Sequence, residues 1–386
     1  MDQADSTKQN RRVGIMTLHY NPNAGSALQA YAIKRLVGEL GFDAQVVNYV
    51  FRGNCRVKKA GCNVFCGPLS QWTPKHVAKW AYQRLASAIR MKKYLPFQRE
   101  LLGVDVRKAA GLTSAPLPDG SEFHRVVVGS DQVWNFDLKT IIDKRYLLDY
   151  IADPAKKVAY GASMGSSDFP AESRQEIEDA IRQFRAVSCR EFDGAERLSH
   201  IRGEDVPVVV DPTLVVDPTV WDKLADKVPA QAKNPYVYVY LREKSLRAME
   251  LAQSVAAKRG LEVLSVTCDR PDGKGKFKRQ GPLEWLRCVR DASYVVTNSF
   301  HGVCFSLVFR KSFNAVTLDG DTWRAQTNSR ITGLLAQVGL EGRYATGDAK
   351  PDCGDIDYGA VGRLLDARRE QSRAWLASAL RDGVQG

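Results

Sequence analysis

The stretch Ala292-Ser293-Tyr294-Val295-Val296-Thr297-Asn298-Ser299-Phe300-His301-Gly302 joins a short apolar run to a polar end. Such a run, bounded by polar residues, is typical of a buried strand. The polar end holds one of only five histidines in the chain. Because ligands bind at the carboxyl ends of the strands in open α/β sheets, this stretch predicts an α/β fold with a ligand site near His301.

A second segment has the same architecture. Residues 125–128 (Arg-Val-Val-Val) predict a strand that runs into Gly129-Ser130-Asp131-Gln132-Val133-Trp134-Asn135. Glycine permits a tight exit from the strand, so that Asp131 can point into a cleft. Two polar strand ends of this kind predict two sheets, or two halves of the molecule, that face one site.

Predicted strands and helices alternate along nearly the whole chain. We expect strands over 13–18, 44–50, 125–128, 157–160, 186–189, 208–210, 236–241, 262–266 and 294–298, and helices over 26–40, 171–184, 246–258, 283–289, 303–309 and 360–380. This alternation predicts parallel, doubly wound sheets. The fold class that we expect is therefore α/β, with two Rossmann-like domains that face a cleft.

A chain of 386 residues favours two domains over one. Turn chemistry at Asp211-Pro212-Thr213 and Asp217-Pro218 places the boundary near residue 220. We expect a polar tail over 1–10, a first domain over 11–220 with a basic helical insertion at about 51–100, and a second domain over 221–386 that ends in a long helix.

The net charge of +12 is concentrated in one segment, because Phe51 to Arg99 holds eleven Lys and Arg but no Asp or Glu. Apolar residues at helical spacing predict a basic amphipathic helix from Lys75 to Lys93. One interpretation is a helix packed on its own domain with a solvated basic face. The other is contact with an anionic membrane surface or a phosphate-bearing acceptor. We expect no nucleic-acid partner, since no recognition module accompanies the charge.

The sequence predicts a cytoplasmic protein. The basic segment raises a further possibility, namely that the protein binds peripherally at the inner face of a membrane. No apolar run approaches the roughly 20 residues that cross a bilayer, and no apolar segment follows the acidic start of the chain.

Eight cysteines without CxxC pairs predict reduced thiols. Cys55, Cys62 and Cys66 fit no standard metal-binding spacing.

Several polar residues at strand ends are candidates for chemistry, and each has a plain structural alternative. His301 is either an acid-base residue or a structural histidine that only caps the helix it begins. Arg190 either binds a carboxylate or phosphate or forms an ion pair with Glu191 or with an acid at a helix start. Asp131 either holds an acceptor hydroxyl, orients a base, or only caps the next helix. Arg330 belongs to a helix start, which either reaches the cleft or only caps its helix. Neither a GxGxxG motif after the first strand nor a P-loop occurs.

Seven segments, taken in order, resemble the polysaccharide pyruvyl transferase family. They are Gly14-Ile15-Met16-Thr17-Leu18-His19-Tyr20 with Gly25 and Leu28-Gln29-Ala30-Tyr31-Ala32, Gly129 to Asn135, Tyr160-Gly161-Ala162-Ser163-Met164-Gly165, Ser188-Cys189-Arg190-Glu191, Val210-Asp211-Pro212-Thr213, Thr297 to Gly302, and Asn328-Ser329-Arg330-Ile331. The resemblance implies the GT-B-like fold of two-domain glycosyltransferases. It also implies transfer of the enolpyruvyl group of phosphoenolpyruvate onto two hydroxyls of a sugar, which gives a pyruvate ketal and free phosphate.

The resemblance implies roles for particular residues. His301 would be the acid-base residue, Arg190 the anchor for the donor's carboxylate or phosphate, and Asp131 a catalytic residue near the acceptor hydroxyls. We expect Ser299, Gly302, Arg324 and Asn298 on the donor side, and Gly25, Ser26, Ser130, Gln132 and Arg330 on the acceptor side or in the cleft. We expect no metal and no cofactor, because arginines and helix starts can carry the charge of phosphoenolpyruvate, which is a substrate.

Two positions depart from the pattern of the family. Some relatives carry an acid after the glycine of the first turn, where this chain has Ser26-Ala27. Others carry a lysine some twenty residues past the histidine, where this chain offers only Arg324. The acceptor implied is a sugar in a polysaccharide or lipid-linked glycan. Two other functions stay open: a glycosyltransferase of the same fold that uses a nucleotide sugar, and a non-catalytic membrane-associated assembly factor.

Overall fold

The computed structural model describes residues 11–51, 73–74, 77, 81, 91–135, 143–165, 169–242, 245–267, 280–317, 328–346 and 351–381. The tail 1–10, Arg324 and the cysteines Cys55, Cys62 and Cys66 lie outside these residues. So does most of the predicted basic helix, of which Val77 and Ala81 are helical and exposed. The interpretations of that helix therefore stay predictions.

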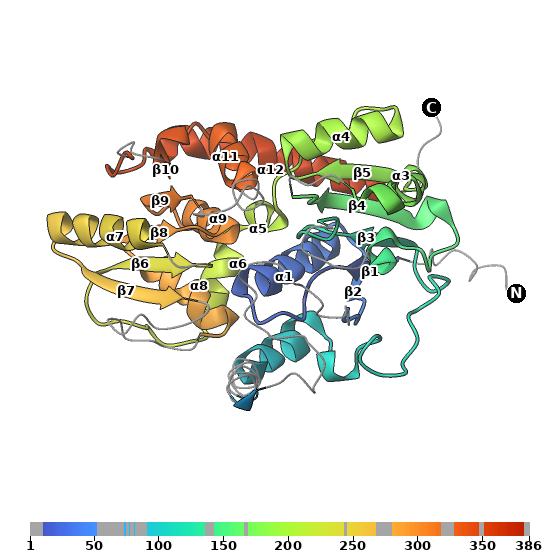
Figure 1. The fold of residues 1–386 in the computed structure, drawn as a ribbon, viewed down its shortest axis with the longest axis horizontal. Helices are drawn as coiled ribbons and strands as arrows, with labels where there is room; N and C mark the ends of the chain where they lie inside the picture. The colour runs from blue at the N-terminus through green and yellow to red at the C-terminus, as the bar shows by residue number, and fades with distance from the viewer. Residues whose placement is uncertain are drawn as a thin grey trace, which may run out of the picture.

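Two parallel sheets form the framework of the described chain. The first holds β1 (Arg12–Met16), β2 (Asp43–Val46), β3 (Arg125–Val128), β4 (Lys157–Ala162) and β5 (Ala186–Cys189), in the order β2-β1-β3-β4-β5. The second holds β6 (Tyr236–Leu241), β7 (Glu262–Thr267), β8 (Tyr294–Thr297), β9 (Phe313–Val316) and β10 (Tyr344–Ala345), in the order β10-β9-β8-β6-β7. When the strands of each sheet are numbered from its own first strand, both orders read 2-1-3-4-5, a doubly wound arrangement. The predicted α/β fold class is confirmed (Figure 1).

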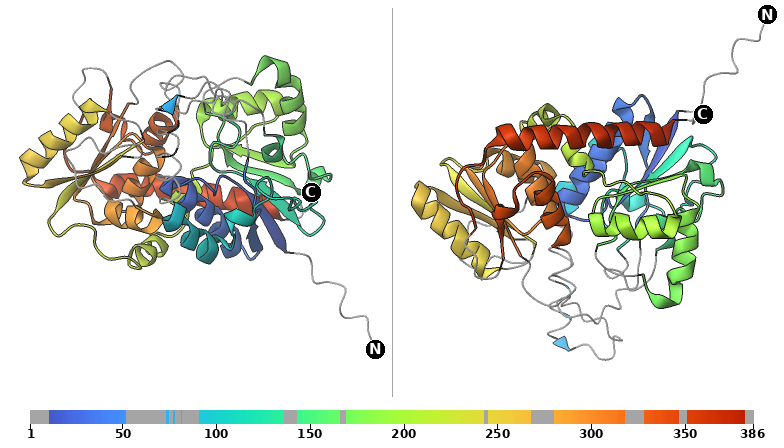
Figure 2. Two further views of the ribbon diagram at one scale, coloured as in Figure 1. Left: turned by 60° about the horizontal axis from the view of Figure 1, so that its bottom comes forward. Right: turned by 90° about the horizontal axis from the view of Figure 1, so that it is seen from above.

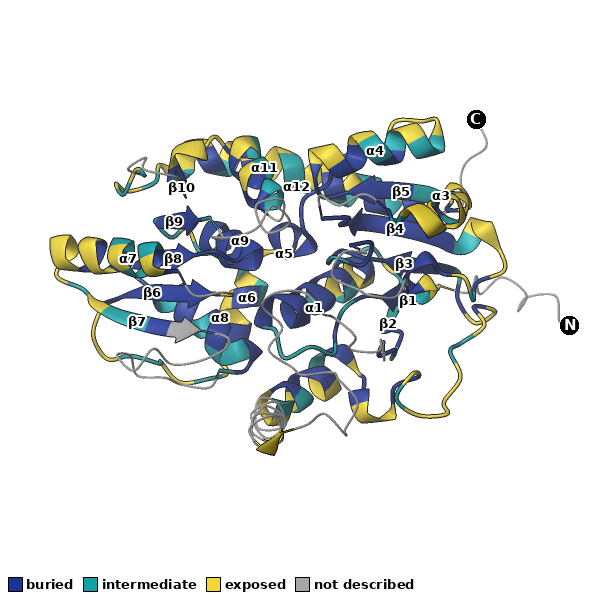
Figure 3. Cartoon of the chain, viewed as in Figure 1, coloured by how far each residue is buried: buried dark blue, intermediate teal, exposed yellow. Residues whose placement is uncertain are grey.

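The strands form where apolar residues can be buried on both faces. In β6, the tyrosines Tyr236, Tyr238 and Tyr240 pack into one core, and Val237, Val239 and Leu241 pack into another. A strand covered on both faces reads as a continuous apolar run rather than an alternating one. Figure 3 shows the consequence: the central strands are buried along their length, and the exposed residues lie mostly on the outer helices.

Helices cover the sheets on both faces. They are α1 (Ala24–Glu39), α3 (Arg174–Arg182), α4 (Phe192–Arg202), α5 (Pro212–Val215), α6 (Pro218–Ala225), α7 (Leu246–Arg259), α8 (Pro282–Asp291), α9 (Phe300–Val308), α11 (Ser329–Gln337) and α12 (Tyr358–Leu380).

The strand predicted over 208–210 is wrong, because only a single bridge joins Cys189 to Val208. The N–H of Val210 donates instead to the side chain of Ser372, at 3.0 Å.

One hydrophobic core runs from the first sheet to the second. It includes Val13 and Ile15 of β1 and Val295 of β8. Trp221 of α6 stands in its middle, with its ring 5.8 Å from that of Tyr31 and 5.0 Å from that of Phe305. In Figure 1, α1, α5 and α9 lie between the two sheets. Because this core is continuous, the strand ends of the two sheets are held close together.

The last helix, α12, also joins the two sheets. Near its start, the Tyr358 hydroxyl donates to the carbonyl of Lys311, at 2.6 Å. Near its end, the Leu380 carbonyl pairs with the ring of His124, at 2.8 Å. The right panel of Figure 2 shows this helix crossing from the second sheet to the first. The predicted domain boundary at 220 stays a prediction, but the helix assigned to the second domain contacts both.

Leu376 and Leu364 lie on α12, and they provide a matched test of this contact. Leu376 is fully buried in the shared core, whereas Leu364 is 48% exposed. Truncation of a buried leucine leaves a cavity, so Leu376→Ala should lower the free energy of unfolding by about 2–5 kcal/mol. Leu364→Ala should change it by less than about 0.5 kcal/mol. Equal effects in urea unfolding would show that α12 does not hold the two halves together.

Candidate active site

Segments far apart in the sequence converge between the two sheets. The loop after β3 brings Ser130, Asp131 and Gln132; the end of β5 brings Arg190; the starts of α1, α5 and α9 bring Gly25 with Ser26, Asp211, and His301. The first sheet's contributions follow β1, β3 and β5, and the second sheet's follow β8. Ligands bind at such a place in doubly wound folds, where the strand order reverses between β1 and β3 and between β6 and β8.

The carboxylate of Asp211 joins these segments. Its Oδ2 accepts a hydrogen bond from Nη1 of Arg190 at 2.6 Å and from the Ser130 hydroxyl at 3.3 Å, and it lies 3.5 Å from Nε2 of His301. Its Oδ1 accepts from the N–H and the hydroxyl of Thr213, at 3.0 and 2.7 Å. Burial opposes the charged form, but His301 and Arg190 outweigh it and lower the pKa of Asp211. The carboxylate is therefore ionised at neutral pH.

Asp131 is a second ionised carboxylate of the site. It accepts a hydrogen bond from the Ser26 hydroxyl at 2.7 Å and from the N–H of Gln132 at 2.8 Å. Burial opposes its charge as well, but the charges of His301 and Arg190 outweigh burial and lower the pKa of Asp131. Ser26 of α1 thus contacts the acid that the loop after β3 supplies.

His301 lies where the first turns of α1 and α9 meet. A Cβ atom added to Gly25 would lie only 2.4 Å from Nδ1 of His301, which is closer than Cβ atoms approach non-bonded atoms in real structures. The ring is therefore held between the backbone of α1 and the carboxylate of Asp211. The Nε2 atom of His301 is buried and makes no hydrogen bond to the residues that the structure describes.

Arg190 is buried and paired mainly with Asp211. Its Nε lies 3.7 Å from Glu191, which is too far for a hydrogen bond, so the tight ion pair is with Asp211 and not with the neighbour in sequence. Burial works against its charge, but Asp211, Glu191 and Asp131 together raise its pKa above the usual value. Its guanidinium lies 4.2 Å above the ring of Phe300, the first residue of α9.

Three of the predicted donor-side residues lie at the start of α9: Asn298 and Ser299 precede the helix, and Gly302 is in its first turn. Ser299 caps the helix and accepts a hydrogen bond from the N–H of Gly302, at 3.4 Å. The side chain of Asn298 accepts from the N–H of Arg242, at 2.7 Å. The structure thus places these residues beside His301, and their contact with a donor stays a prediction.

A family model of polysaccharide pyruvyl transferase matches residues 23–320, more than three quarters of the chain. The chain belongs to the polysaccharide pyruvyl transferase family. The matched range includes most of the site, from Gly25 to Gly302, and ends before Arg330.

The other comparisons give remote structural likenesses. A UDP-GlcNAc 2-epimerase of Methanocaldococcus jannaschii, in complex with UDP-GlcNAc and UDP, is 11% identical, with 92% of this chain and 99% of that one covered and a TM-score of 0.42. A UDP-GlcNAc 2-epimerase of Neisseria meningitidis, bound to UDP-GlcNAc, is 10% identical, with 95% and 96% covered and a TM-score of 0.44. No curated protein matches the chain.

Three residues of the pyruvyl transferase site were not among the sequence candidates: Asp211, Glu191 and Phe300. The sequence around Asp211 indicates only a turn, because an Asp before a Pro is typical of a helix start. The apolar residues Val208 to Val210 before it were the signal that this helix start is buried. Phe300 carried no such signal, since its contact with Arg190 depends on how the two sheets approach each other.

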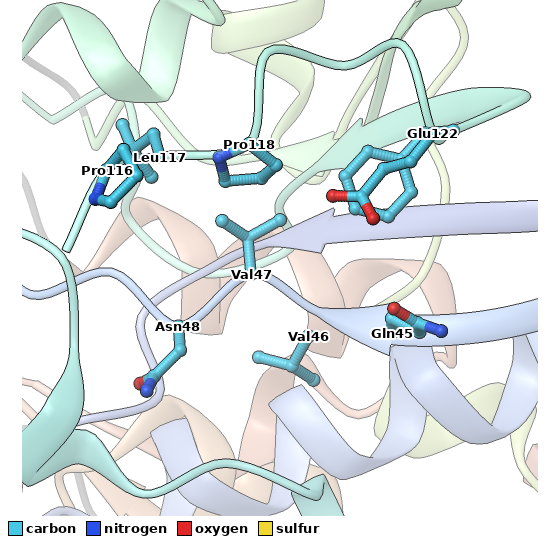
Figure 4. Close-up of a pocket in the computed structure, with 9 residues that line it drawn as sticks. Gln45, Val46, Val47, Asn48, Pro116, Leu117, Pro118 and Glu122 are labelled. Carbon is cyan, nitrogen blue, oxygen red and sulfur yellow. The ribbon is translucent and has the colours of Figure 1, made fainter.

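Two cavities lie away from these residues. One, of about 380 Å³, lies beside the end of β2 and is lined by Val47 and Asn48 and by the segment Pro116, Leu117 and Pro118, with the side chain of Val47 directed toward Pro118 (Figure 4). The other, of about 600 Å³, lies between α1, α6 and α12. Neither is lined by a predicted site residue. Within the described residues, no group of three or more His, Cys, Asp or Glu could hold a metal ion.

Gly25→Ala tests the close approach of α1 to His301. The added methyl group must displace the ring, and a misplacement of about 1 Å costs on the order of 10²-fold in rate. We therefore expect transferase activity to fall by about that factor. The control is Gly38→Ala on the same helix, where a Cβ would meet nothing within 4 Å. It should leave activity unchanged and stabilise the helix by about 0.5–1 kcal/mol. Full activity in Gly25→Ala would mean that His301 does not need its observed position.

Asp211→Asn tests the central ion pair through its pH dependence. Because the pKa of Asp211 is lowered in the folded protein, its charge stabilises the fold above the unfolded pKa of about 3.9, and this stabilisation is lost as pH falls through the folded pKa. The substitution leaves Arg190 without its main partner, which should cost about 3–5 kcal/mol at pH 7. The difference from wild type should shrink below about pH 4.

Asp217→Asn is the matched control for this pH series. Asp217 precedes Pro218 and Thr219 as Asp211 precedes Pro212 and Thr213, and it accepts the same two hydrogen bonds from its threonine. However, it is exposed on the surface. Since Asn and Asp cap helices about equally well, this substitution should cost only a few tenths of a kcal/mol. Similar losses in both variants would assign Asp211 a capping role alone.

Proposed function

We propose that this chain transfers the enolpyruvyl group of phosphoenolpyruvate onto two hydroxyls of a sugar in a polysaccharide or lipid-linked glycan. The products are a cyclic pyruvate ketal and inorganic phosphate. Membership of the family supports the reaction class. The observation that carries the proposal is the convergence of a histidine, a buried arginine and two ionised carboxylates between the sheets, where His301, Arg190, Asp131 and Asp211 meet.

The reaction needs a proton at the methylene carbon of the donor, which becomes a methyl group and leaves positive charge at C2. A sugar hydroxyl then attacks C2 and loses its proton, and a second hydroxyl takes the place of the phosphate. We assign His301 to the proton transfers, because imidazole both gives and takes protons near neutral pH. Positioned acid-base catalysis of this kind contributes about 10²- to 10⁴-fold in rate.

The ionised carboxylates suit the reaction steps that follow protonation of the donor. Positive charge at C2 is stabilised by fixed negative charge nearby, and such preorganised groups are worth more in a buried site than in water. Asp131 and Asp211 are both buried and both ionised. We assign Asp131 to the attacking hydroxyl, whose proton its carboxylate would accept, and Asp211 to holding the ring of His301 and the guanidinium of Arg190.

Arg190 suits the anionic donor. Nη1 pairs with Asp211, while Nε and Nη2 are buried and make no hydrogen bond within the described part of the chain. A guanidinium offers its donors in a planar fork that matches a carboxylate or phosphate. We therefore assign these two atoms to an anionic group of phosphoenolpyruvate.

The acceptor side of the proposal includes a membrane. A lipid-linked glycan would be presented at the inner face of the membrane, and the eleven basic residues of Phe51 to Arg99 carry charge suited to an anionic surface. Within the described residues, the protein contains no helix of the length and apolar character that a membrane span requires. Contact would in this proposal be peripheral.

The decisive assay combines purified protein, phosphoenolpyruvate and a panel of lipid-linked and free glycosides. We expect phosphate release together with a product heavier by one pyruvate ketal. His301→Ala should lower the rate by about 10²-fold or more. The control is His200→Ala, since His200 is exposed on α4 and should not affect the rate.

Other outcomes would assign a different function. Release of a nucleoside diphosphate from a nucleotide sugar, with no use of phosphoenolpyruvate, would identify a glycosyltransferase. Retention of biological function in His301→Ala, with loss when the charges of Lys75 to Lys93 are removed, would identify a non-catalytic assembly factor.

A further inference from the structure

A second arginine lies near Arg190, and it belongs to a helix that follows β9 of the second sheet. Arg330 belongs to the first turn of α11, and its guanidinium lies 5.9 Å from the centre of the Phe300 ring. The guanidinium of Arg190 lies 4.2 Å from the same centre. Phe300 is 6% exposed. One buried ring therefore contacts two cationic side chains that are 140 residues apart in sequence.

Both arginines keep hydrogen-bond donors unused. Among the described residues, Nε of Arg330 is buried without a partner, as are Nε and Nη2 of Arg190. A buried donor without a partner loses its hydration and gains nothing in return. Three such donors on neighbouring cations are the complement of a ligand with several acceptor oxygens.

The electrostatics of the pair favour the same kind of ligand. Burial and the charge of Arg190 lower the pKa of Arg330 to about 10, although Glu191 and Asp131 act in the opposite direction. Two guanidinium groups that repel each other in a buried site are stabilised by an anion bound beside them.

The acid closest in sequence does not use these donors. Glu191 is buried, and its oxygens accept hydrogen bonds from the Ser163 hydroxyl and from the thiol of Cys189. Burial raises the pKa of Glu191, although Arg190 and Arg330 work against that change. Glu191 thus compensates part of the charge of the arginines, and their unused N–H groups stay available for a ligand.

We propose that Arg330 is a specificity-determining residue that binds one anionic group of the donor while Arg190 binds the other, and that Phe300 positions the two guanidinium groups. The site would then select small donors with two anionic groups, such as a phosphate and a carboxylate. This inference rests on the proposed function and changes the role expected for Arg330, which the sequence placed on the acceptor side or in the cleft.

The test measures binding by calorimetry, apart from any transfer reaction. Phosphoenolpyruvate, inorganic phosphate and pyruvate are titrated into wild type, Arg330→Gln, Arg330→Lys and Arg373→Gln. Wild type should bind phosphoenolpyruvate more tightly than either single anion. Arg330→Gln should weaken phosphoenolpyruvate by roughly 10- to 100-fold, the usual range for hydrogen bonds to charged groups. It should also weaken only one of the two single anions, and Arg330→Lys should recover part of the loss.

The controls separate this inference from general damage and from the proposed function. Arg373→Gln removes a half-buried arginine that pairs with Glu39 on another face of the protein, away from Arg190 and Arg330, and it should bind all three ligands as wild type does. Unchanged binding of phosphoenolpyruvate in Arg330→Gln would overturn the role of Arg330. If wild type binds a nucleoside diphosphate instead of phosphoenolpyruvate, and Arg330→Gln weakens that binding, the arginine pair stands while the proposed donor fails.

Phe300 is tested by two substitutions that differ in their contact with a cation. Phe300→Leu removes the aromatic face and should raise the KM for the donor by roughly 3- to 30-fold, the range of a cation–π contact, with the KM for the acceptor unchanged. Phe300→Tyr keeps the ring and should restore the KM for the donor. Thermal unfolding checks that both variants fold. An unchanged donor KM in a folded Phe300→Leu would show that Phe300 only fills space.

Discussion

The buried carboxylate of Asp211 is the interaction on which the rest of the site depends. It belongs to the segment that links the two sheets, and it contacts Arg190 from the end of β5 and His301 from the start of α9. A carboxylate in such a place stays charged only if its partners outweigh the cost of burial, which they do here. Both partners help to keep it charged. The two sheets that carry these residues are joined by the core around Trp221 and by α12.

The sequence predicts the fold well where a strand is buried on both faces. Continuous apolar runs such as Tyr236 to Leu241 leave little choice of structure. It fails at Val208 to Val210, which is also continuously apolar but follows Pro207 and leads into a helix start. There, the N–H of Val210 binds Ser372, more than 160 residues later, and no local pattern carries that information.

The candidate site likewise has residues that the local sequence predicts and contacts that it does not predict. Asp131, Arg190 and His301 follow directly from strand ends, and the structure brings them together. Arg190 and His301 contact Asp211, and both also act on the pKa of Asp131. The pairing of Arg190 with Arg330 does not follow, because it requires the first turns of α9 and α11 to meet the end of β5. Contacts between the sheets depend on how the domains pack against each other. Position along a strand cannot reveal them.

The site holds fixed charges of both signs, and the proposed reaction needs both. The donor arrives with negative charge, which the guanidinium groups of Arg190 and Arg330 would bind through their unused donors. After protonation, the reacting carbon of the proposed donor would become positive, and the carboxylates of Asp131 and Asp211 would then stabilise it. Because Ser26, Ser130 and Thr213 already fix these carboxylates, little reorganisation is needed at the moment of reaction. In this proposal the donor keeps its anionic groups while its reacting carbon becomes positive, so the site would need buried charges of both signs, where apolar packing would give greater stability.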